Sequence, residues 1–510
     1  MPDNTSNNKR IAKNTILLYF RMILMMGINL LTSREILRAI GVDDYGIYTV
    51  VGGVVALFGI VSNSLSAATQ RYITHGLGKN EPERLNIIFS TSVFIHILMC
   101  ILIFILAETI GLWFIKNEIL IPADRMYASM WVYQCAVIST IIMIISVPYN
   151  AAINAHEKMG AFAFISLIEV VMKLGIVYLL YIIPADKLIL YAVLLVIVQL
   201  CIRFCYTNYC QKHFKECKFI FVKDIKLIKE IGAFSTWSLL GNAAYISYTQ
   251  GLNVLLSMFF APAVNAARGI AIQAQTAVNL FAQNFQMAMN PQITKSYASN
   301  NLEYMHSLVF KSARFSYFML FLLSLPILIE CETILKIWLS IVPEYTVTFL
   351  RIILVTSCIN AMANPLIISV KATGKIKKYE LVVGTLMLMI LPVSYVFLKF
   401  GYPPYIVFIV NLCFEILAQG FRIWITHRLI NFSISNFKKE VILRTGLVTI
   451  ISAILPIILY RYLDRNLMSF FIICTVSILS GSLTIYYIGL KNSEQDIITS
   501  KIKKFIHHFR

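Results

Sequence analysis

Apolar residues fill long runs of this chain, and short polar segments separate the runs. Of the 510 residues, 58% are hydrophobic and 14% are charged, whereas soluble domains carry about 25% charged residues. The runs are about 20 residues long, which is the length of helix needed to cross a hydrocarbon core of roughly 30 Å. The pattern therefore predicts an all-α polytopic membrane protein, because the strands of a β-barrel would be short and alternating.

The spacing of the apolar runs predicts about fourteen transmembrane helices. The two most polar of them are expected at 46–68 and 266–289. An even number of spans places both termini on the same side of the membrane. The expected limits are 12–33, 46–68, 85–107, 127–150, 160–182, 187–208, 233–259, 266–289, 308–329, 346–369, 379–399, 403–425, 443–462 and 467–489.

The distribution of positive charge predicts the orientation. The termini and the even-numbered loops hold 29 of the 44 Lys and Arg residues, and the odd-numbered loops hold 10. Because short cytoplasmic loops are enriched in Lys and Arg, both termini are expected in the cytoplasm, with the chain in the cell (inner) membrane. The net charge of +19 thus reflects the topology of the chain. Its basic residues are expected beside lipid headgroups, and no nucleic-acid partner is expected.

A repeated segment indicates an internal duplication. The sequence "ATQRYITHGLGKNEPE" at 68–83 returns in weaker form as "MNPQITKSYASNNLE" at 289–303, so that Ile73 aligns with Ile293 and Thr74 with Thr294. Further along the two copies, Pro148 aligns with Pro365, and Gln199 aligns with Gln419. Two copies of a six-helix unit have an even number of helices each, so the repeats are parallel.

The duplication predicts five regions. Two equivalent lobes could rock about a site between them and open to each side of the membrane in turn. Between the lobes, alternating Lys, Phe and Ile residues predict an amphipathic helix on the cytosolic interface. The expected regions are an N-lobe at 1–208, the cytosolic linker at 209–232, a C-lobe at 233–426, two appended helices at 427–490 and a basic cytosolic tail at 491–510.

Polar residues form stripes along three of the predicted spans. Lipid tails cannot satisfy amides, so these faces must meet either protein or a wet cavity. Helix–helix hydrogen bonding explains a single amide well, whereas runs on equivalent helices favour a cavity that binds a hydroxyl-rich sugar. The stripes are Asn63, Ser66 and Gln70; Ser238, Asn242, Tyr245, Thr249 and Asn253; and Arg268, Gln275, Asn279, Gln283, Gln286 and Asn290.

Charged residues within the spans are costly and mark candidate sites. Arg21 lies midway along the first span without an acid within four residues, so an anion site in the cavity or an ion pair to another helix is expected. Two intramembrane ion pairs are expected from helical spacing, and four arginines at the mouths of spans could attract a pyrophosphate by bidentate contacts. The expected pairs are Glu169 with Lys173 and Glu415 with Arg422; the mouth residues are Arg34, Arg38, Arg268 and Arg71.

Other chemistry is poorly supported. The chain lacks a G-x-x-x-x-G-K-[ST] loop, and its ten cysteines form no C-x-x-C pair, so neither a bound nucleotide nor a metal or other cofactor is expected. A cation-coupled drug exporter remains an alternative, although its buried carboxylate would have to be Glu169 or Glu415. A membrane-embedded glycosyltransferase or ligase would need an acidic cluster, for which the adjacent pair Asp43 and Asp44 is the sole candidate in the sequence.

Several motifs together resemble a known family. They are "TSREILRAIGVDDYGIYTVVGGVVALF", "SLSAATQRYIT", "ISVPYNAAINAHEKMGAFAFISLIEV", "VNAARGIA" and "NFQMAMNPQITKSYA". With two six-helix lobes and two further helices, the chain resembles the Wzx-type oligosaccharide flippases of the multidrug/oligosaccharidyl-lipid/polysaccharide superfamily, which is MATE-like. The resemblance covers essentially the whole chain.

The resemblance implies a flippase and not an enzyme. Such proteins move a polyprenyl-pyrophosphate-linked sugar unit to the outer leaflet for O-antigen, capsule or exopolysaccharide assembly, with polysaccharide polymerase and ligase proteins as possible partners. A V-shaped pair of lobes around a cationic cavity is implied, and Arg21 and Arg268 are counterparts in role of cavity arginines in relatives. Drug exporters of the superfamily place an acid in the first helix, whereas this span has none before Glu35.

Overall fold

The structure is a computed structural model, and nearly every residue that it describes is helical. Ten helical segments in the described part are long and apolar enough to cross a membrane. The chain is therefore a multi-pass helical membrane protein, as its hydrophobic pattern predicts. The described residues are 4–41, 44, 47–48, 51, 59–79, 82–117, 122–220, 224–260, 262–339, 342–464, 466–496 and 499.

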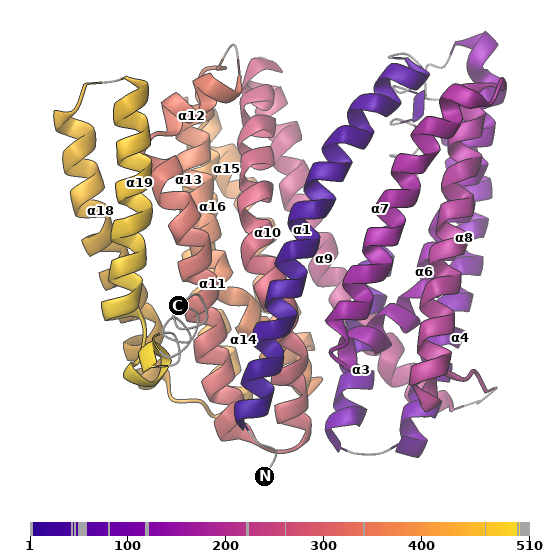
Figure 1. Cartoon of the computed structure of the whole chain (residues 1–510), viewed down its shortest axis with the longest axis horizontal. Coiled ribbons are helices and arrows are strands. Elements are labelled where there is room, and N and C mark those ends of the chain that lie inside the picture. Colours follow the sequence, from indigo (N-terminus) through magenta and orange to yellow (C-terminus); the bar gives the residue numbers. More distant parts are fainter. Residues whose placement is uncertain are drawn as a thin grey trace, which may run out of the picture. The chain divides into compact units, whose positions relative to one another are not determined.

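The first of two compact units comprises Met1–Ala243 together with Thr294–Asn301. Within it, α6 packs against α8, α3 and α4, and α1 packs along α7 (Figure 1). Its helices are α1 (Asn4–Ile40), α3 (Gly59–Lys79), α4 (Pro82–Leu106), α5 (Leu112–Asn117), α6 (Met126–Ala155), α7 (Met159–Ile182), α8 (Lys187–His213) and the first part of α9 (Ile225–Phe259).

The second unit comprises Ala244–Ile293 and Leu302–Arg510. In it α16 packs against α13, α14 and α15, and the C-terminal pair α18 and α19 packs against α11. Its helices are the rest of α9, α10 (Pro262–Ala298) as far as Ile293, α11 (Leu302–Ile329), α12 (Cys331–Trp338), α13 (Thr346–Ala361), α14 (Ala363–Thr373), α15 (Lys377–Lys399), α16 (Ile406–Ile430), α17 (Ile434–Phe437), α18 (Arg444–Tyr462) and α19 (Leu467–Thr484). The domain limits expected from the sequence stay a prediction, because these units group residues by contact.

Three long helices are less apolar than the others, and two of them, α9 and α10, carry polar stripes. α1, α9 and α10 have 37, 35 and 37 residues, and at 1.5 Å per residue each exceeds the thickness of the hydrocarbon core. None of the three is among the ten apolar segments of the described residues. Ten of the 23 residues of the predicted span 46–68 lie outside the described residues, and α3 begins at Gly59.

The predicted amphipathic helix at 209–232 is wrong as a separate element. Residues up to His213 complete α8, a single 3-10 turn follows at Lys215–Cys217, and α9 already begins at Ile225. The hydrophobic–basic pattern instead belongs to the end of α8, the turn after it and the start of α9.

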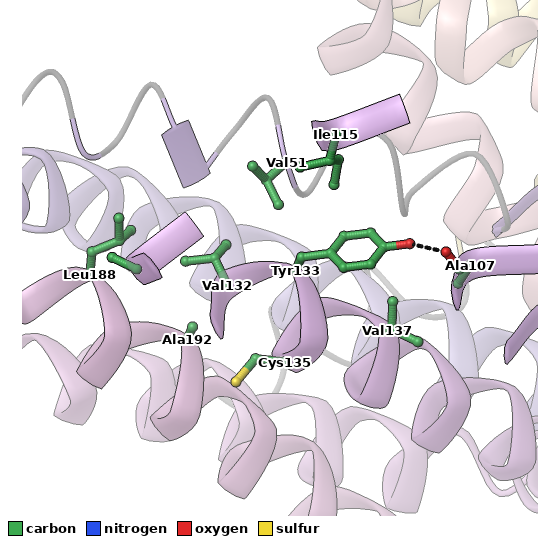
Figure 2. Close-up of a cluster of buried hydrophobic side chains, with 10 residues drawn as sticks. Val51, Ala107, Ile115, Val132, Tyr133, Cys135, Val137, Leu188 and Ala192 are labelled. Carbon is green, nitrogen blue, oxygen red and sulfur yellow. Dashed lines mark hydrogen bonds between the residues drawn. The ribbon is translucent and has the colours of Figure 1, made fainter. Parts of the chain in front are cut away.

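One aromatic residue organises part of the core of the first unit (Figure 2). Tyr133 on α6 is fully buried, and its hydroxyl donates to the carbonyl of Ala107 over 2.6 Å. Ala107 opens a five-residue π-helix, Ala107–Gly111, that links α4 to α5. A Cβ added at Gly111 would lie 2.4 Å from the Tyr133 hydroxyl oxygen. Glycine at this position therefore leaves enough space for the hydroxyl group and its hydrogen bond.

The two copies of the repeated segment meet within the first unit. A Cβ on Gly78 would lie 2.6 Å from the Cβ of Ala298, its counterpart at the shift of 220 residues. The rings of His75 and Tyr297 also lie together, with centroids 6.3 Å apart. The ends of α3 and α10 therefore pack closely, which a side chain at position 78 would prevent.

Candidate functional site

Arg21 has an aromatic partner on a neighbouring helix. Its guanidinium lies 4.4 Å from the ring centroid of Phe162, which α7 contributes. A cation over a ring face is attracted by the negative charge of that face, and more strongly where water is excluded. Tyr206 and Glu169 act on Arg21 electrostatically, but no carboxylate of the described residues lies within 4.0 Å of it. Arg21 is thus positioned by stacking and keeps its charge uncompensated by an ion pair.

The nearest acid is already engaged. Lys173 Nζ lies 2.6 Å from Glu169 Oε1, one turn further along α7. The two side chains are 33% and 24% exposed, so the pair is partly accessible. Glu169 is therefore neutralised locally, as its helical spacing suggests.

Arg203 on α8 is a further cation of this unit that the sequence reasoning did not single out. Its guanidinium lies 5.6 Å from the ring centroid of Tyr149 on α6. The repeat offered a signal: Arg203 follows Gln199 by four residues, and Arg422 follows Gln419 by three. Equivalent helices of the two repeats thus both carry an arginine one turn after a glutamine.

Arg268 is the corresponding uncompensated cation of the second unit. It lies near the start of α10 and is 5% exposed. Its guanidinium donates to the Asn253 side-chain oxygen and, over 2.8 Å, to the carbonyl of Thr249, both on α9. Within the described residues these neutral oxygens hold it, and no carboxylate lies within 4.0 Å. The side chain is therefore fixed by neutral oxygens, and no ion pair within the described residues balances its charge.

The deep carboxylate of the second unit is paired. Glu415 and Arg422 on α16 form an ion pair of 3.0 Å, and both are almost fully buried. The desolvation of two buried charges offsets most of their attraction, but removal of one partner would leave the other stranded. Arg422 thus balances the charge of Glu415 in this structure.

Three of the stripe amides join helices to one another. Asn242 donates to the hydroxyl of Ser64 over 2.8 Å within the first unit. In the second unit Gln275 donates to Ser357 over 2.7 Å, and Gln286 donates to the carbonyl of Ala361 over 3.0 Å. These three amides therefore form helix–helix hydrogen bonds, which was the alternative to a cavity for the polar stripes.

Other members of the stripes have more accessible side chains. Tyr245 is 54% exposed and meets Tyr248 edge to face, with centroids 5.3 Å apart. Gln283 is exposed, and the half-buried members are Gln70, Asn279 and Asn290. These side chains are thus more accessible than that of Gln286, which is buried.

The residues expected at the mouths of the spans separate into different environments. Arg38 is exposed and paired with Glu35 at 3.1 Å. Arg71 lies over Tyr72 and Phe234, at 4.7 and 5.2 Å from the ring centroids. The side chains of Arg34 and Asn63 lie outside the described residues.

Two of the arginines in the described helices lack an ion pair, whereas two of the carboxylates have one. The deep carboxylates Glu169 and Glu415 have cationic partners, whereas Arg21 and Arg268 rest on neutral groups. No group of three or more His, Cys, Asp or Glu side chains that could hold a metal occurs in the part of the chain that the structure describes. Each unit thus contains, within its described residues, an arginine whose charge no ion pair balances.

Comparison with known proteins identifies the fold. The family model MatE matches residues 18–179, which span most of α1 through most of α7. A multidrug resistance MATE family transporter of the MOP superfamily in an outward-facing conformation superposes with a TM-score of 0.69 at 13% identity, covering 83% of this chain and 96% of that one. A MATE protein in a bent conformation gives a TM-score of 0.70 at 12% identity, covering 85% and 96%.

A third similar structure comes from an archaeon. It is a MOP superfamily transporter from Pyrococcus furiosus, with a TM-score of 0.67 at 14% identity, covering 84% of this chain and 97% of that one. Its description reports a binding pocket of reverse polarity that suggests a different function. No curated protein sequence matches the chain. The comparisons thus establish a MATE-like fold in a multi-pass membrane protein.

Proposed function

We propose that this chain, which has the fold of MATE transporters, is a flippase for a polyprenyl-pyrophosphate-linked oligosaccharide that works by alternating access. Such a substrate combines a diphosphate, which needs cations, with sugars, which need amides and aromatic groups. The product would supply the assembly of a surface polysaccharide, with polymerase and ligase proteins of that pathway as partners.

The positive charge of the spans is the observation that carries this proposal. Each unit holds an arginine, Arg21 or Arg268, with no carboxylate within 4.0 Å in the described residues. A diphosphate can accept bidentate hydrogen bonds from a guanidinium, and such charge-assisted bonds are about twice as strong as neutral ones. A cationic drug would instead be repelled by an arginine that lies at its binding site.

A transport assay tests the proposal. The purified protein would be reconstituted in liposomes that contain a fluorescent polyprenyl-pyrophosphate oligosaccharide in one leaflet, and an impermeant quencher would report its arrival in the other. We expect faster exchange than in protein-free liposomes, and soluble pyrophosphate should slow it. Exchange at the protein-free rate, both with and without a membrane potential, would contradict the proposal.

A cation-coupled multidrug exporter is the second candidate, and the comparisons favour it. One of the similar structures is a multidrug resistance transporter, and the partly exposed pair of Glu169 with Lys173 contains a carboxylate that a proton or Na⁺ could reach. This candidate predicts drug–proton exchange in the same liposomes, and its loss in Glu169→Gln. The flippase proposal predicts neither result.

The orientation of the chain is part of the proposal. We place both termini in the cytoplasm of a cell with the protein in its inner membrane, on the basis of the loop charges. In a cysteine-free variant, single cysteines would replace Lys212, in the last turn of α8, and Lys399, at the end of α15, and would be labelled in intact cells with an impermeant maleimide. Labelling only at position 399 is expected, and labelling only at position 212 would reverse the orientation.

A further inference from the structure

A pocket of the second unit lies between the junction of α11 with α12 and the connection of α18 to α19. Both parts of the chain lie at the same end of this unit (Figure 1). The pocket has a volume of about 180 Å³ and is lined by two carboxylates, Glu330 and Asp464. No Lys or Arg is among its described lining residues, so the pocket carries a formal charge of two negative units.

Glu330 is the buried acid of this pocket. It lies between α11 and α12 and is 5% exposed. The Thr333 hydroxyl donates to its Oε2 over 2.6 Å, and no cation of the described residues lies within 4.0 Å of the carboxylate. Its Oε1 accepts no hydrogen bond from the described residues and is not fully enclosed, so it faces the pocket. A carboxylate withdrawn from water without a counter-charge is costly, and a bound cation would remove that cost.

Two more groups offer open oxygen atoms to the same space. Asp464 is exposed, and its side chain has no hydrogen bond or ion pair within the described residues. Ser469 is 7% exposed, and its backbone amide donates to the Asn466 side chain over 2.8 Å while its hydroxyl has no partner in the described residues. Glu330, Asp464 and Ser469 thus provide three acceptors, which is the number of N–H donors on a primary ammonium group.

The rest of the lining favours an organic ammonium over a metal ion. Leu463, Leu467, Phe470 and Ile473 contribute apolar surface, which suits the carbon atoms next to an ammonium nitrogen. A Ca²⁺ ion would need about six to eight oxygen ligands, and the described residues contain no group of three or more His, Cys, Asp or Glu that could hold a metal. The volume corresponds to about six waters at roughly 30 Å³ each, which is enough for an ammonium group and two carbons.

We infer that this pocket binds a primary ammonium group, presented either by a phosphatidylethanolamine headgroup or by a soluble amine. Glu330 supplies the buried counter-charge, Asp464 supplies a second carboxylate at the rim, and Ser469 supplies a neutral acceptor. The site is built by the two appended helices and the start of α12, and it contains none of the residues proposed to bind the transported substrate.

Two substitutions that keep the shape of the side chain test this inference. The full-length protein in phosphatidylcholine nanodiscs would be titrated with ethylammonium, and with tetramethylammonium at equal ionic strength as the probe without N–H donors, by following its Tm. A ligand that binds the folded state raises the Tm, so ethylammonium should raise it and tetramethylammonium should not. Glu330→Gln should weaken ethylammonium binding at least about tenfold, because a charge-assisted hydrogen bond is lost.

An exposed variant and a matched control guard against an effect on folding. Asp464→Asn changes an exposed side chain, and it should weaken binding by a smaller factor than Glu330→Gln, because water screens its charge. Glu344→Gln neutralises an exposed acid between α12 and α13 that does not line the pocket, and it should leave the response to ethylammonium unchanged.

Nanodiscs that contain phosphatidylethanolamine distinguish the two sources of the ammonium group. If a headgroup is the ligand, they should raise the Tm of the wild type more than that of Glu330→Gln and should weaken the response to added ethylammonium. If ethylammonium binds equally in both kinds of nanodisc, the ligand is a soluble amine. Equal responses of the wild type, Glu330→Gln and Asp464→Asn to both sources would overturn the inference, as would a rise in Tm with Ca²⁺ and none with either ammonium source.

Discussion

Lys295 Nζ lies 2.6 Å from Glu157 Oε1, and Arg10 lies 2.8 Å from the other carboxylate oxygen of Glu157. The side chain of Glu157 is fully buried, and its backbone has φ of 59°, in the left-handed region. Pro148 aligns with Pro365 at a shift of 217, and the same shift places Glu157 on Gly374, which has φ of 79°. The first repeat thus keeps a strained glutamate where the second has glycine, and the retained carboxylate joins α1, α10 and the turn after α6.

Removal of this carboxylate should destabilise the protein unless its buried partner is removed as well. Glu157→Gln should lower the free energy of unfolding by about 3 kcal/mol, because Lys295 would be left without its counter-charge. Glu157→Gly should cost about 1 kcal/mol less, since it relieves the left-handed strain. Denaturant unfolding of the detergent-solubilised protein measures both effects.

The double variant Glu157→Gln with Lys295→Met is the matched control for that comparison. Replacing both members of a buried pair with neutral groups is often close to neutral, and Arg10 is 46% exposed and can turn to water. Most of the lost stability should therefore return. A double variant as unstable as the sum of the two single variants would show that the ion pair contributes nothing to this junction.

The sequence predicts the helices of this protein well and its tertiary partners poorly. Long apolar runs are sufficient for most spans, and helical spacing alone indicates the pairs of Glu169 with Lys173 and Glu415 with Arg422. By contrast, the stacking of Arg21 on Phe162 joins residues on α1 and α7 that only the folded lobe brings together. The stripe of α10 could not reveal that Gln286 bonds to a carbonyl on α13, because a buried amide looks the same in a sequence whatever its partner.

The two intramembrane carboxylates should respond differently to neutralisation. Glu415→Gln leaves Arg422, which is only 6% exposed, without its counter-charge and should cost about 3–5 kcal/mol of unfolding free energy. Glu169→Gln acts on a partly exposed i,i+4 pair and should cost below about 1 kcal/mol. Equal losses in the two variants, measured by thermal unfolding in one detergent, would refute the difference in burial as the cause.

Gly111→Ala should disturb the core around Tyr133. The new Cβ would lie 2.4 Å from the Tyr133 hydroxyl oxygen, so that the ring must shift or the hydrogen bond to Ala107 must break. Overpacking of this kind costs about 1–3 kcal/mol. Adding Tyr133→Phe to Gly111→Ala removes the clashing oxygen and should recover part of the loss, which the Tm of both variants would report. No recovery would place the strain elsewhere in the π-helix.

The turn after α8 should show a dependence on acid pH. Burial opposes ionisation of Glu216, but the hydrogen bond from His156 Nε2 and a bond from its own backbone amide outweigh it, so the pKa of Glu216 lies below its ordinary value. A depressed pKa stabilises the folded state above the unfolded-state pKa of about 4.3, and this stabilisation is lost as the pH falls through the folded-state value. The Tm advantage of the wild type over Glu216→Gln should therefore be full near pH 6 and shrink toward pH 3. An advantage that stays constant over this range would contradict the assigned cause.

The central claim is that an uncompensated arginine in the first span holds the diphosphate of the substrate, and Arg21→Ala in the liposome flipping assay tests it most directly. Arg351→Ala is the matched control, since Arg351 is an exposed span residue whose guanidinium bonds to the carbonyl of Leu328. Loss of one charge-assisted contact predicts flipping at least about tenfold slower in Arg21→Ala, with normal membrane insertion and an unchanged rate in Arg351→Ala. A flipping rate in Arg21→Ala equal to that of the wild type would contradict the account.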